Sequence, residues 1–428
     1  MKKNISLFIL IIFIQVLVFP ITFKQAVKTV FKNNPDINLM KENIKAADYS
    51  IKKTISSYFP SLDFNGRYTR IGIIPEFEIP GMGSFKFGTP NNYNFRITTQ
   101  YMVYDWNKRG NLKVLSEKNK TIMENSYTSL KKNMVYTIAN IFSSTNILIK
   151  SKNIFESNLI TLKKHLEVVK KRFDAGIVPS YDILSTKVQI SKTEARILDI
   201  EKVIKNMELS LKQLLNTDDN IKIEGDIELL PVKYDSQSLI EIAVSNREDM
   251  KNLYLQKSLI QVQKKVNKTA LLPILAFQAN YELRNGMLPD IDKLKQNWNL
   301  NFTIAYKIFD GFKTKYQNKI LTVQDNQITL KIESLKGKIK TDIEKSLINI
   351  LSLKKQLQKE KENLELAEEA YKTVVKAYSK GAVSNMDVLN ASSNLKFAKL
   401  SILKIKNQIK MEKLKLINTI GLEFWRLK

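Results

Sequence analysis

The chain has 428 residues, with 13 glycines, 10 prolines, no cysteine, one histidine and a formal net charge of +27. The lack of cysteine excludes a disulfide framework, a zinc–thiolate site and a cysteine-linked lipid anchor. Its lysines are spread along the chain, with no compact basic block flanked by aromatic residues. The charge therefore favours a solvated helix surface over a nucleic-acid-binding protein, although the size of the charge is unexplained.

The first 20 residues have the pattern of a secretory signal peptide. Residues 1–4 contain two lysines and precede a mostly apolar stretch at 5–19, which is short for a membrane-spanning helix. No Ala-x-Ala motif marks a cleavage site, so an uncleaved anchor is the alternative. We assign residues 1–20 to a signal peptide.

A short helix is predicted next, and the chain contains a second version of it. Residues 21–37 end in Asn-Asn-Pro-Asp-Ile, and residues 239–250 end in Asn-Arg-Glu-Asp-Met, with Glu248 in place of the proline. Both stretches run on into helical patterns, roughly 37–57 and 250–270. The chain therefore begins to look like two tandem copies of one unit.

The pattern then changes to an alternation of apolar and polar residues. It occurs in four segments, 62–69, 93–103, 275–283 and 298–308. A period of two predicts β-strands with one apolar and one polar face. Strands of about ten residues with aromatic side chains on the apolar face are long enough to cross an outer membrane when tilted. The alternative is an ordinary soluble hairpin, but no other segment offers a core for it.

Four strands cannot close a barrel, and open sheet edges are not tolerated in lipid. Several chains must therefore share one barrel. Between the first two strands, residues 69–92 are rich in glycine and proline and predict a flexible external loop. The loop between the second pair, around residues 285–289, is shorter.

Two pairs of helices account for most of the remaining chain. Residues 107–174 and 312–379 contain no proline, and at ~1.5 Å per residue each helix would be about 100 Å long. Return helices are predicted at 180–216 and 384–420. Apolar residues take heptad spacing toward the turns, which predicts coiled-coil packing. We interpret His165, in this stripe, as a packed or solvated helix residue rather than a metal ligand.

These patterns give a domain plan with two repeats. The first repeat covers residues 21–217 and the second covers residues 239–422. A linker at 218–238 joins them, and residues 423–428 form a C-terminal tail.

The turn between the paired helices is repeated closely. Residues 172–184 and 377–389 share a glycine, Gly176 or Gly381, followed six residues later by Asp182 or Asp387. Glycine supplies the positive φ that ends a helix. The aspartate then falls in the first turn of the next helix, where the helix dipole favours a carboxylate.

This duplicated pattern, Tyr/Phe-x-x-Gly-x-x-x-x-x-Asp-Ile/Val-Leu, resembles that of TolC-like outer-membrane efflux proteins, and the resemblance covers nearly the whole chain. It implies a mostly α protein with membrane β-structure. Long helical hairpins of a homotrimer would form a periplasmic α-barrel, and four strands per chain would form a shared 12-stranded β-barrel. The implied function is a passive exit duct of a tripartite efflux or type I secretion system. The duct would lie in outer-membrane lipid, extend into the periplasm, and work with a periplasmic adaptor and an inner-membrane pump.

The resemblance also implies roles for residues near the turns. Asp182, Tyr378 and Asp387 would form the periplasmic gate, opened by separation of the hairpin tips. The adaptor would dock on six tip residues: Gly176, Ile177, Val178, Gly381, Ala382 and Val383. Val383 stands where family members that lock the tip have an arginine, and Asn390 replaces a second aspartate, so we expect a weaker or differently built lock. The alternative for both aspartates is stabilisation of a helix start by about 0.3–1 kcal/mol.

No residues suited to catalysis stand out. The sequence has no nucleophile–base pair, phosphate-binding glycine loop or metal-ligand spacing, so we expect no enzyme activity, no cofactor, no metal site and no nucleic-acid partner. Two other functions are open: a structural or adhesive envelope coiled-coil protein without channel activity, and a cytosolic basic coiled coil that binds nucleic acid. The alternating strands disfavour the second.

Overall fold

The structure is a computed structural model that describes residues 18–81, 83–86, 88–227, 229, 235–288, 290–423 and 425. Most of the predicted signal peptide, part of the predicted linker and most of the predicted tail lie outside these residues. The chain divides into two compact units. One comprises the chain up to Lys41, Ser126–Met250 and the chain from Leu335 onward; we call it the hairpin unit. The other comprises Glu42–Asn125 and Lys251–Ser334 and is called the sheet unit.

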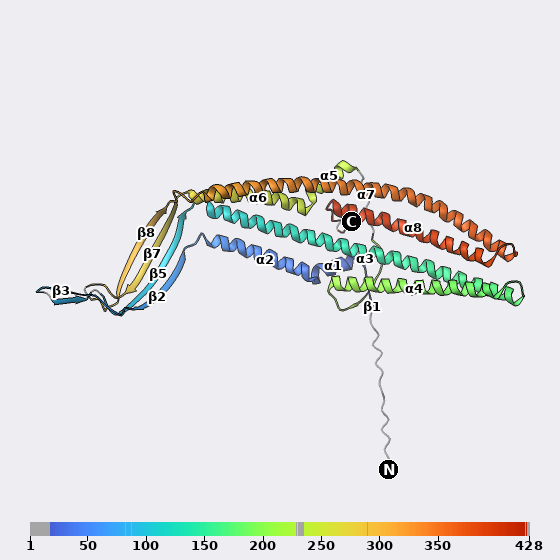
Figure 1. The fold of residues 1–428 in the computed structure, drawn as a ribbon, viewed down its shortest axis with the longest axis horizontal. Coiled ribbons are helices and arrows are strands. Elements are labelled where there is room, and N and C mark those ends of the chain that lie inside the picture. The colour runs from blue at the N-terminus through green and yellow to red at the C-terminus, as the bar shows by residue number, and fades with distance from the viewer. Residues whose placement is uncertain are drawn as a thin grey trace, which may run out of the picture. The chain divides into compact units, whose positions relative to one another are not determined.

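Two helical hairpins dominate the hairpin unit, and their turns lie at the same end of it (Figure 1). The four helices are α3 (Lys108–Asp174), α4 (Ser180–Leu215), α7 (Lys313–Ser379) and α8 (Asn385–Thr419), and the first parts of α3 and α7, up to Asn125 and Ser334, belong to the sheet unit. With 67 residues each, α3 and α7 confirm the predicted long helices. Among the described residues, none of the helices combines the length and the apolar character needed to cross a membrane.

Shorter elements complete the hairpin unit. They are β1 (Val18–Ile21), α1 (Phe23–Asn33), β6 (Asn220–Ile223) and α5 (Ser236–Asn246). β6 lies within the segment predicted as a linker and pairs in parallel with β1. α1 begins with a capping box in which the Thr22 side chain accepts from the N–H of Gln25, while the Gln25 side chain accepts from the N–H of Thr22.

The main core of this unit gathers apolar side chains from α1, α3, α4, β6 and α8. Phe142 on α3 is fully buried and meets Phe23 edge to face, with ring centroids 5.8 Å apart. Smaller apolar clusters follow toward the turns; one contains Leu162, Ile190 and Leu389 from three different helices. These contacts hold both hairpins together, as the heptad pattern predicts.

A buried ion pair joins the two halves of the sequence within the hairpin unit. Lys132 Nζ on α3 lies 2.6 Å from Glu248 Oε1, at the start of α6 (Glu248–Lys268), and donates to the Gly421 carbonyl at 2.7 Å. In the first repeat, α2 (Pro35–Ser56) starts with Pro35 at the equivalent place. The two repeats therefore differ at this position, and the residue that differs, Glu248, is the one that binds Lys132.

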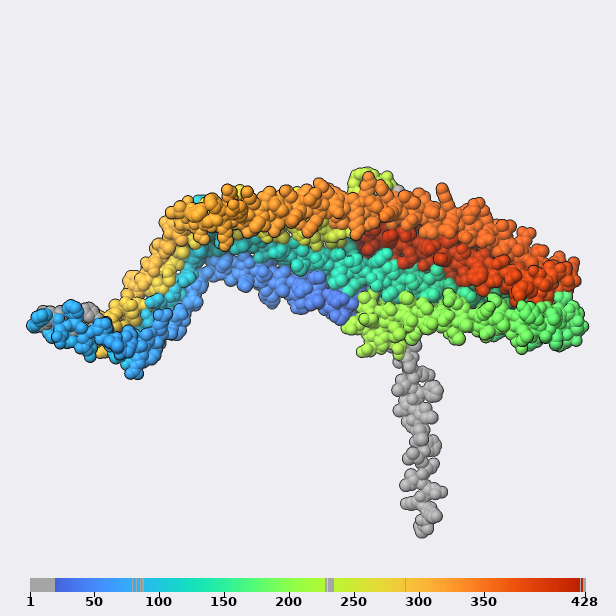
Figure 2. Space-filling model, in the orientation of Figure 1, coloured from blue at the N-terminus to red at the C-terminus, as the bar shows by residue number. Residues whose placement is uncertain are grey.

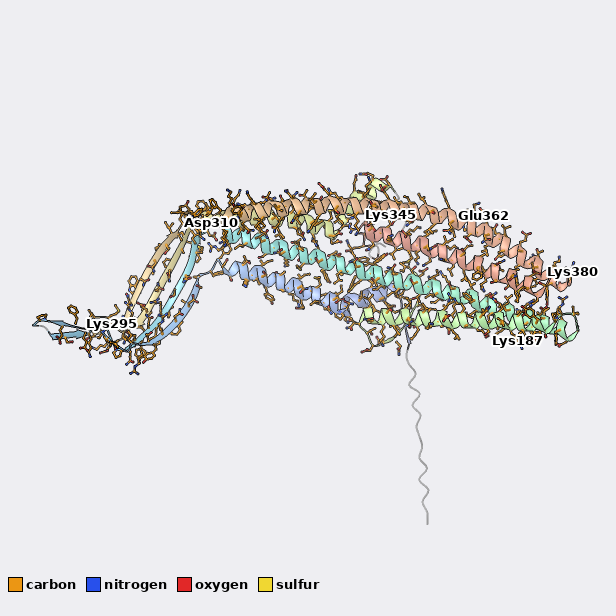
Figure 3. All side chains as sticks on the ribbon, viewed as in Figure 1. Lys187, Lys295, Asp310, Lys345, Glu362 and Lys380 are labelled. Carbon is orange, nitrogen blue, oxygen red and sulfur yellow. The ribbon has the colours of Figure 1, made fainter. Side chains whose placement is uncertain are left out.

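Four antiparallel strands form the sheet of the sheet unit, in the order β2-β5-β7-β8. Their bounds are β2 (Ser61–Arg70), β5 (Asn91–Tyr104), β7 (Ile274–Arg284) and β8 (Lys295–Ala305). Figure 3 labels Lys295 at one end of the sheet and Asp310 beyond the other. All four predicted strands are present. However, β8 ends at Ala305, so Tyr306 and Ile308, predicted as strand residues, lie beyond it.

The predicted flexible loop at residues 69–92 contains a short hairpin. Its strands are β3 (Glu76–Ile79) and β4 (Gly83–Lys86), which pair antiparallel. Gly81 and Gly83 have φ of +85° and +84°, a conformation that glycine adopts without a steric penalty. The turn chemistry of this glycine-rich stretch therefore gives part of the loop regular structure.

Candidate functional site

The repeated glycines end α3 and α7 as predicted. Gly176 has φ +73° and Gly381 has φ +78°. In each turn the next N–H bonds back into the helix, Ile177 to the Arg172 carbonyl at 2.8 Å and Ala382 to the Ala377 carbonyl at 3.0 Å. This is the left-handed helix termination for which glycine is favoured.

The six predicted docking residues divide into two groups. Gly176, Ile177, Gly381 and Ala382 are exposed, and 62% of the Ile177 surface is accessible. Val178 and Val383 are partly buried, because they pack against a small apolar cluster between the hairpins. The exposed part of each tip is therefore narrow. Figure 2 shows these turns at the end of the hairpin unit, green for the first and red for the second.

The two predicted gate aspartates have different surroundings. Asp387 is exposed, and its carboxylate accepts from the Ser384 N–H at 2.9 Å and from the Ser384 hydroxyl at 2.6 Å. These two hydrogen bonds, that of the hydroxyl first, lower the pKa of Asp387. The contact is a capping box at the start of α8 and agrees with the helix-start alternative. Asp182 lies in the first turn of α4, where the N-cap is Pro179 and no side chain caps the helix.

Tyr378, the third predicted gate residue, is buried between the hairpins. Its exposed fraction is 4%, and it packs with Val169 of α3 and Val388 of α8. The Arg172 guanidinium lies over its ring, 4.5 Å from the centroid, and donates to its carbonyl at 2.8 Å. Arg172 belongs to the first hairpin and Tyr378 to the second, so this contact ties their tips together.

Asn385 forms a second link at the tip and was not among the predicted site residues. The side chain is 2% exposed. Its Nδ2 lies within 3.2 Å of the Asp182 carbonyl and of the Ser185 and Thr186 hydroxyls, all on α4. Its Oδ1 lies 2.7 Å from His165 Nε2 on α3. Since Nδ2 is the donor toward α4, Oδ1 accepts, and His165 must carry its hydrogen on Nε2.

His165 is packed rather than solvated. Its ring centroid lies 5.2 Å from that of Tyr378, and partial burial lowers its pKa below the ordinary value of 6.5. The hydrogen bond to Asn385 and the charge of Asp182 act in the opposite direction. Burial thus favours the neutral form of the only histidine of the chain inside the tip cluster, which we define as His165, Arg172, Tyr378 and Asn385.

In this sheet apolar side chains are exposed and several polar side chains are buried, which is the reverse of the pattern in a soluble protein. On its apolar face Leu62, Phe302 and Ile304 are 73%, 72% and 74% exposed, whereas Thr98 and Glu282 on its polar face are 7% and 6% exposed. Polar side chains bond across the strands on that face, for example Arg96 to Glu282 at 2.8 Å and Thr98 to Asn280 at 2.9 Å. An outward apolar surface of this size with aromatic residues is typical of strands that face lipid.

Neither outer strand of this sheet has a partner on its free side within the described chain. β2 runs antiparallel to β5, and β8 runs antiparallel to β7, so β2 and β8 point in opposite directions. They could therefore pair with each other between copies. In the described residues no group of three or more histidine, aspartate or glutamate side chains is placed to hold a metal ion.

An exposed apolar strand face on a sheet with open edges is typical of proteins that form a barrel in an outer membrane. The chain belongs to the outer membrane efflux protein family, whose model matches residues 26–217 and 239–422. A search of curated proteins found no match.

Solved structures with the same fold agree with this assignment. CusC superposes with a TM-score of 0.79 at 15% identity, covering 93% of this chain and 92% of CusC. VceC, an outer-membrane protein of Vibrio cholerae, has a TM-score of 0.79 at 16% identity, with coverage of 94% and 96%. The CmeC outer-membrane channel of Campylobacter jejuni has a TM-score of 0.77 at 16% identity, with coverage of 93% and 85%.

Family and fold confirm several predictions. The protein is an outer-membrane efflux protein, and it is not an enzyme. Its fold is mostly helical with four main strands and two tandem repeats, as the duplicated turn indicates. The roles of the gate and docking residues stay predictions.

Proposed function

We propose that three copies of this chain form a passive exit duct of a tripartite efflux or type I secretion system. Their sheets would close a 12-stranded barrel in outer-membrane lipid, and their helical hairpins would form a periplasmic tunnel. The exposed apolar face of the sheet carries this proposal, since leaving Phe302 and Ile304 in water would cost the free energy that burial of such side chains normally supplies. Lipid contact removes that cost.

The open edges of the sheet support the shared barrel. Unpaired backbone groups are not tolerated in lipid, so β2 and β8 need partners. Pairing β2 of one copy with β8 of the next supplies them and keeps every neighbouring pair antiparallel. Three copies with four strands each close the barrel.

The hairpin tips are the proposed gate and docking site. The duct opens when the tips separate. Asp182 and Tyr378 take part in the contacts between hairpins that must change, and Asp387, whose carboxylate caps α8, is next to Val388, which packs with Tyr378. Arg172 takes the place of the arginine missing at Val383, because it holds Tyr378 from the other hairpin. A periplasmic adaptor would dock on the exposed Gly176, Ile177, Gly381 and Ala382, with Val178 and Val383 beneath, and an inner-membrane pump would supply the energy.

Planar-bilayer recording of the purified protein tests the duct. We expect a trimer with discrete conductance that rises when Arg172 is replaced by alanine, because the tip then loosens. A trimer that conducts neither as wild type nor with Arg172→Ala would instead be a structural envelope protein. Deletion of the gene in a strain lacking paralogues should also raise sensitivity to exported compounds or reduce protein secretion.

A further inference from the structure

The polar face of the sheet carries a row of cations at the end of the strands next to the β3–β4 hairpin. Strand register pairs Arg67 with Asn94, Asn94 with Arg284, and Arg284 with Lys295. Residues paired directly across antiparallel strands project from the same face. Arg67, Arg284 and Lys295 therefore share one face and one level; we call them the basic row. Figure 3 labels Lys295 at this end of the sheet.

Charges of opposite sign cancel only part of this row. Among the described residues, neither Arg67 nor Lys295 has a carboxylate within 4 Å, and the Lys295 ammonium donates instead to the Met287 carbonyl at 2.8 Å. One rung away, Glu282 lies between Arg96 at 2.8 Å and Arg284 at 3.3 Å, so two guanidinium groups share one carboxylate. The polar face thus keeps an excess of positive charge at this level.

Few acidic residues lie near the basic row, and some of them already pair with a lysine. Asp63 lies two rungs further along the same face, opposite Thr98. In the β3–β4 hairpin, Glu76 pairs with Lys86 at 3.2 Å, and in the loop after β7, Asp290 pairs with Lys293 at 3.4 Å. Glu78 and Asp292 have no ion pair among the described residues. All four carboxylates lie outside the four-stranded sheet, so none of them faces the basic row by register.

We propose that the basic row makes the external end of the duct select for anions. This inference rests on the proposed duct, in which the apolar face meets lipid and the polar face lines the lumen. Three chains with three such cations each would then surround the lumen with nine positive charges at one level. The solutes favoured there are anionic ones, such as carboxylates, phosphorylated compounds or acidic peptides, and a ring of like charges is an established way to obtain such a preference.

The preference for anions that the basic row produces should depend on the salt concentration. The Debye length is about 10 Å at 0.1 M salt and about 3 Å at 1 M, so the row acts across much of the lumen only at low salt. The preference for anions over cations should therefore be measurable at 0.1 M and nearly absent at 1 M.

Arg67 and Arg70 provide a matched pair of variants. Both are exposed arginines of β2, but alternation of side chains places Arg70, which pairs with Asn91, on the opposite face. The experiment measures the reversal potential of wild-type, Arg67→Gln, Arg67→Gln/Lys295→Gln and Arg70→Gln trimers in planar bilayers under a KCl gradient. The gel mobility of each trimer shows that assembly is intact.

At about 0.1 M salt we expect the chloride-to-potassium permeability ratio to fall about twofold in Arg67→Gln, and further in the double variant, because fixed cations raise the local anion concentration. Arg70→Gln should keep the wild-type ratio. A conducting double variant with the wild-type ratio, or an equal shift in Arg70→Gln, would overturn the basic row alone. Absence of conductance in every protein, wild type included, would overturn the duct together with the row.

Discussion

Arg172 and Tyr378, which are 206 residues apart in the sequence, connect the tips of the two hairpins. The guanidinium lies 4.5 Å from the centre of the ring and donates to the carbonyl of the same residue at 2.8 Å. The position equivalent to Arg172 in the second repeat is Ala377, so the contact is made once per chain. In the proposed function this contact is the tip lock, and it comes from the first hairpin rather than from an arginine at Val383.

Replacing Arg172 by alanine should loosen the tip. The cation–π contact and the charged hydrogen bond together are worth about 1–3 kcal/mol, and amides of residues 172–184 and 377–389 should exchange hydrogen correspondingly faster. Arg196→Ala is the control, because Arg196 is exposed and its one ion pair, with Asp199, is long at 4.0 Å. Equal exchange rates in the two variants would contradict the lock.

Replacing Asn385 by alanine should destabilise the same region through a different contact. The change leaves the His165 Nε2–H without its partner in a partly buried site, while the Thr186 hydroxyl keeps only its hydrogen bond to the Asp182 carbonyl, at a cost of about 1–3 kcal/mol. Thermal unfolding of the purified trimer measures the loss. Asn390→Ala, at an exposed position of the same helix, should be close to wild type. An equally small effect for both would show that the Asn385 network contributes nothing.

The tip should also weaken in acid. Burial holds the pKa of folded His165 below 6.5, so its neutral form stabilises the folded tip fully above pH 6.5, and the stabilisation is lost as the pH falls through the lower folded value. Hydrogen exchange of the tip at pH 7.5 and pH 5 should therefore differ more in the wild type than in His165→Gln, which cannot titrate. The same pH response in both proteins would exclude His165 as its source.

Asp387 can be tested as a gate residue separately from its role in the cap. Ser384→Ala removes the capping hydroxyl and should cost about 1 kcal/mol of helix stability. Asp387→Asn keeps the shape of the side chain but removes the charge. If the carboxylates of three chains form a ring, Asp387→Asn alone should relieve block of the conductance by divalent cations. Identical block in the wild type and in Asp387→Asn would leave Asp387 only its structural role.

Removing one partner of the buried Lys132–Glu248 pair should have the largest effect on stability. Both side chains are about one-tenth exposed, so Lys132→Ala leaves a buried carboxylate, at a cost of about 3–5 kcal/mol. The exposed pair of Lys150 and Asp226, at 3.8 Å, provides the comparison, and Lys150→Ala should cost less than about 1 kcal/mol. Chemical denaturation of both variants gives the two values. A small loss in Lys132→Ala would mean that water or another cation reaches Glu248.

The elements of this fold are predictable because their signals are local. Helical periodicity without proline gives α3 and α7, alternation gives the four strands, and Gly176 and Gly381 mark the turns. Even the limits of the prediction have local causes: β8 stops before Tyr306 because its partner β7 begins at Ile274, directly after Pro273, which has no N–H to donate.

The contacts of the tip cluster were not predictable in the same way. Arg172 and Asn385 act on residues about 200 positions away, and a single sequence does not show such pairs. Comparison of the two repeats does not predict the role of Asn385 either, because the equivalent residue in the first repeat is Ser180, which is a different residue type and is exposed. The sequence does single out Glu248, because it breaks the repeat at a position where the first half has a proline. Nothing in the sequence singles out its partner Lys132.

Disulfide cross-linking between the outer strands tests the shared barrel most directly, because the chain has no cysteine of its own. Asn65→Cys in β2 would be combined in turn with Asn297→Cys, Asn299→Cys or Asn301→Cys in β8, all on the polar face. On oxidation in the outer membrane, at least one combination should give covalent dimers and trimers that reduction converts to monomers, while the single variants give none. Monomers alone in all three combinations would contradict a barrel closed by β2 and β8 of neighbouring chains.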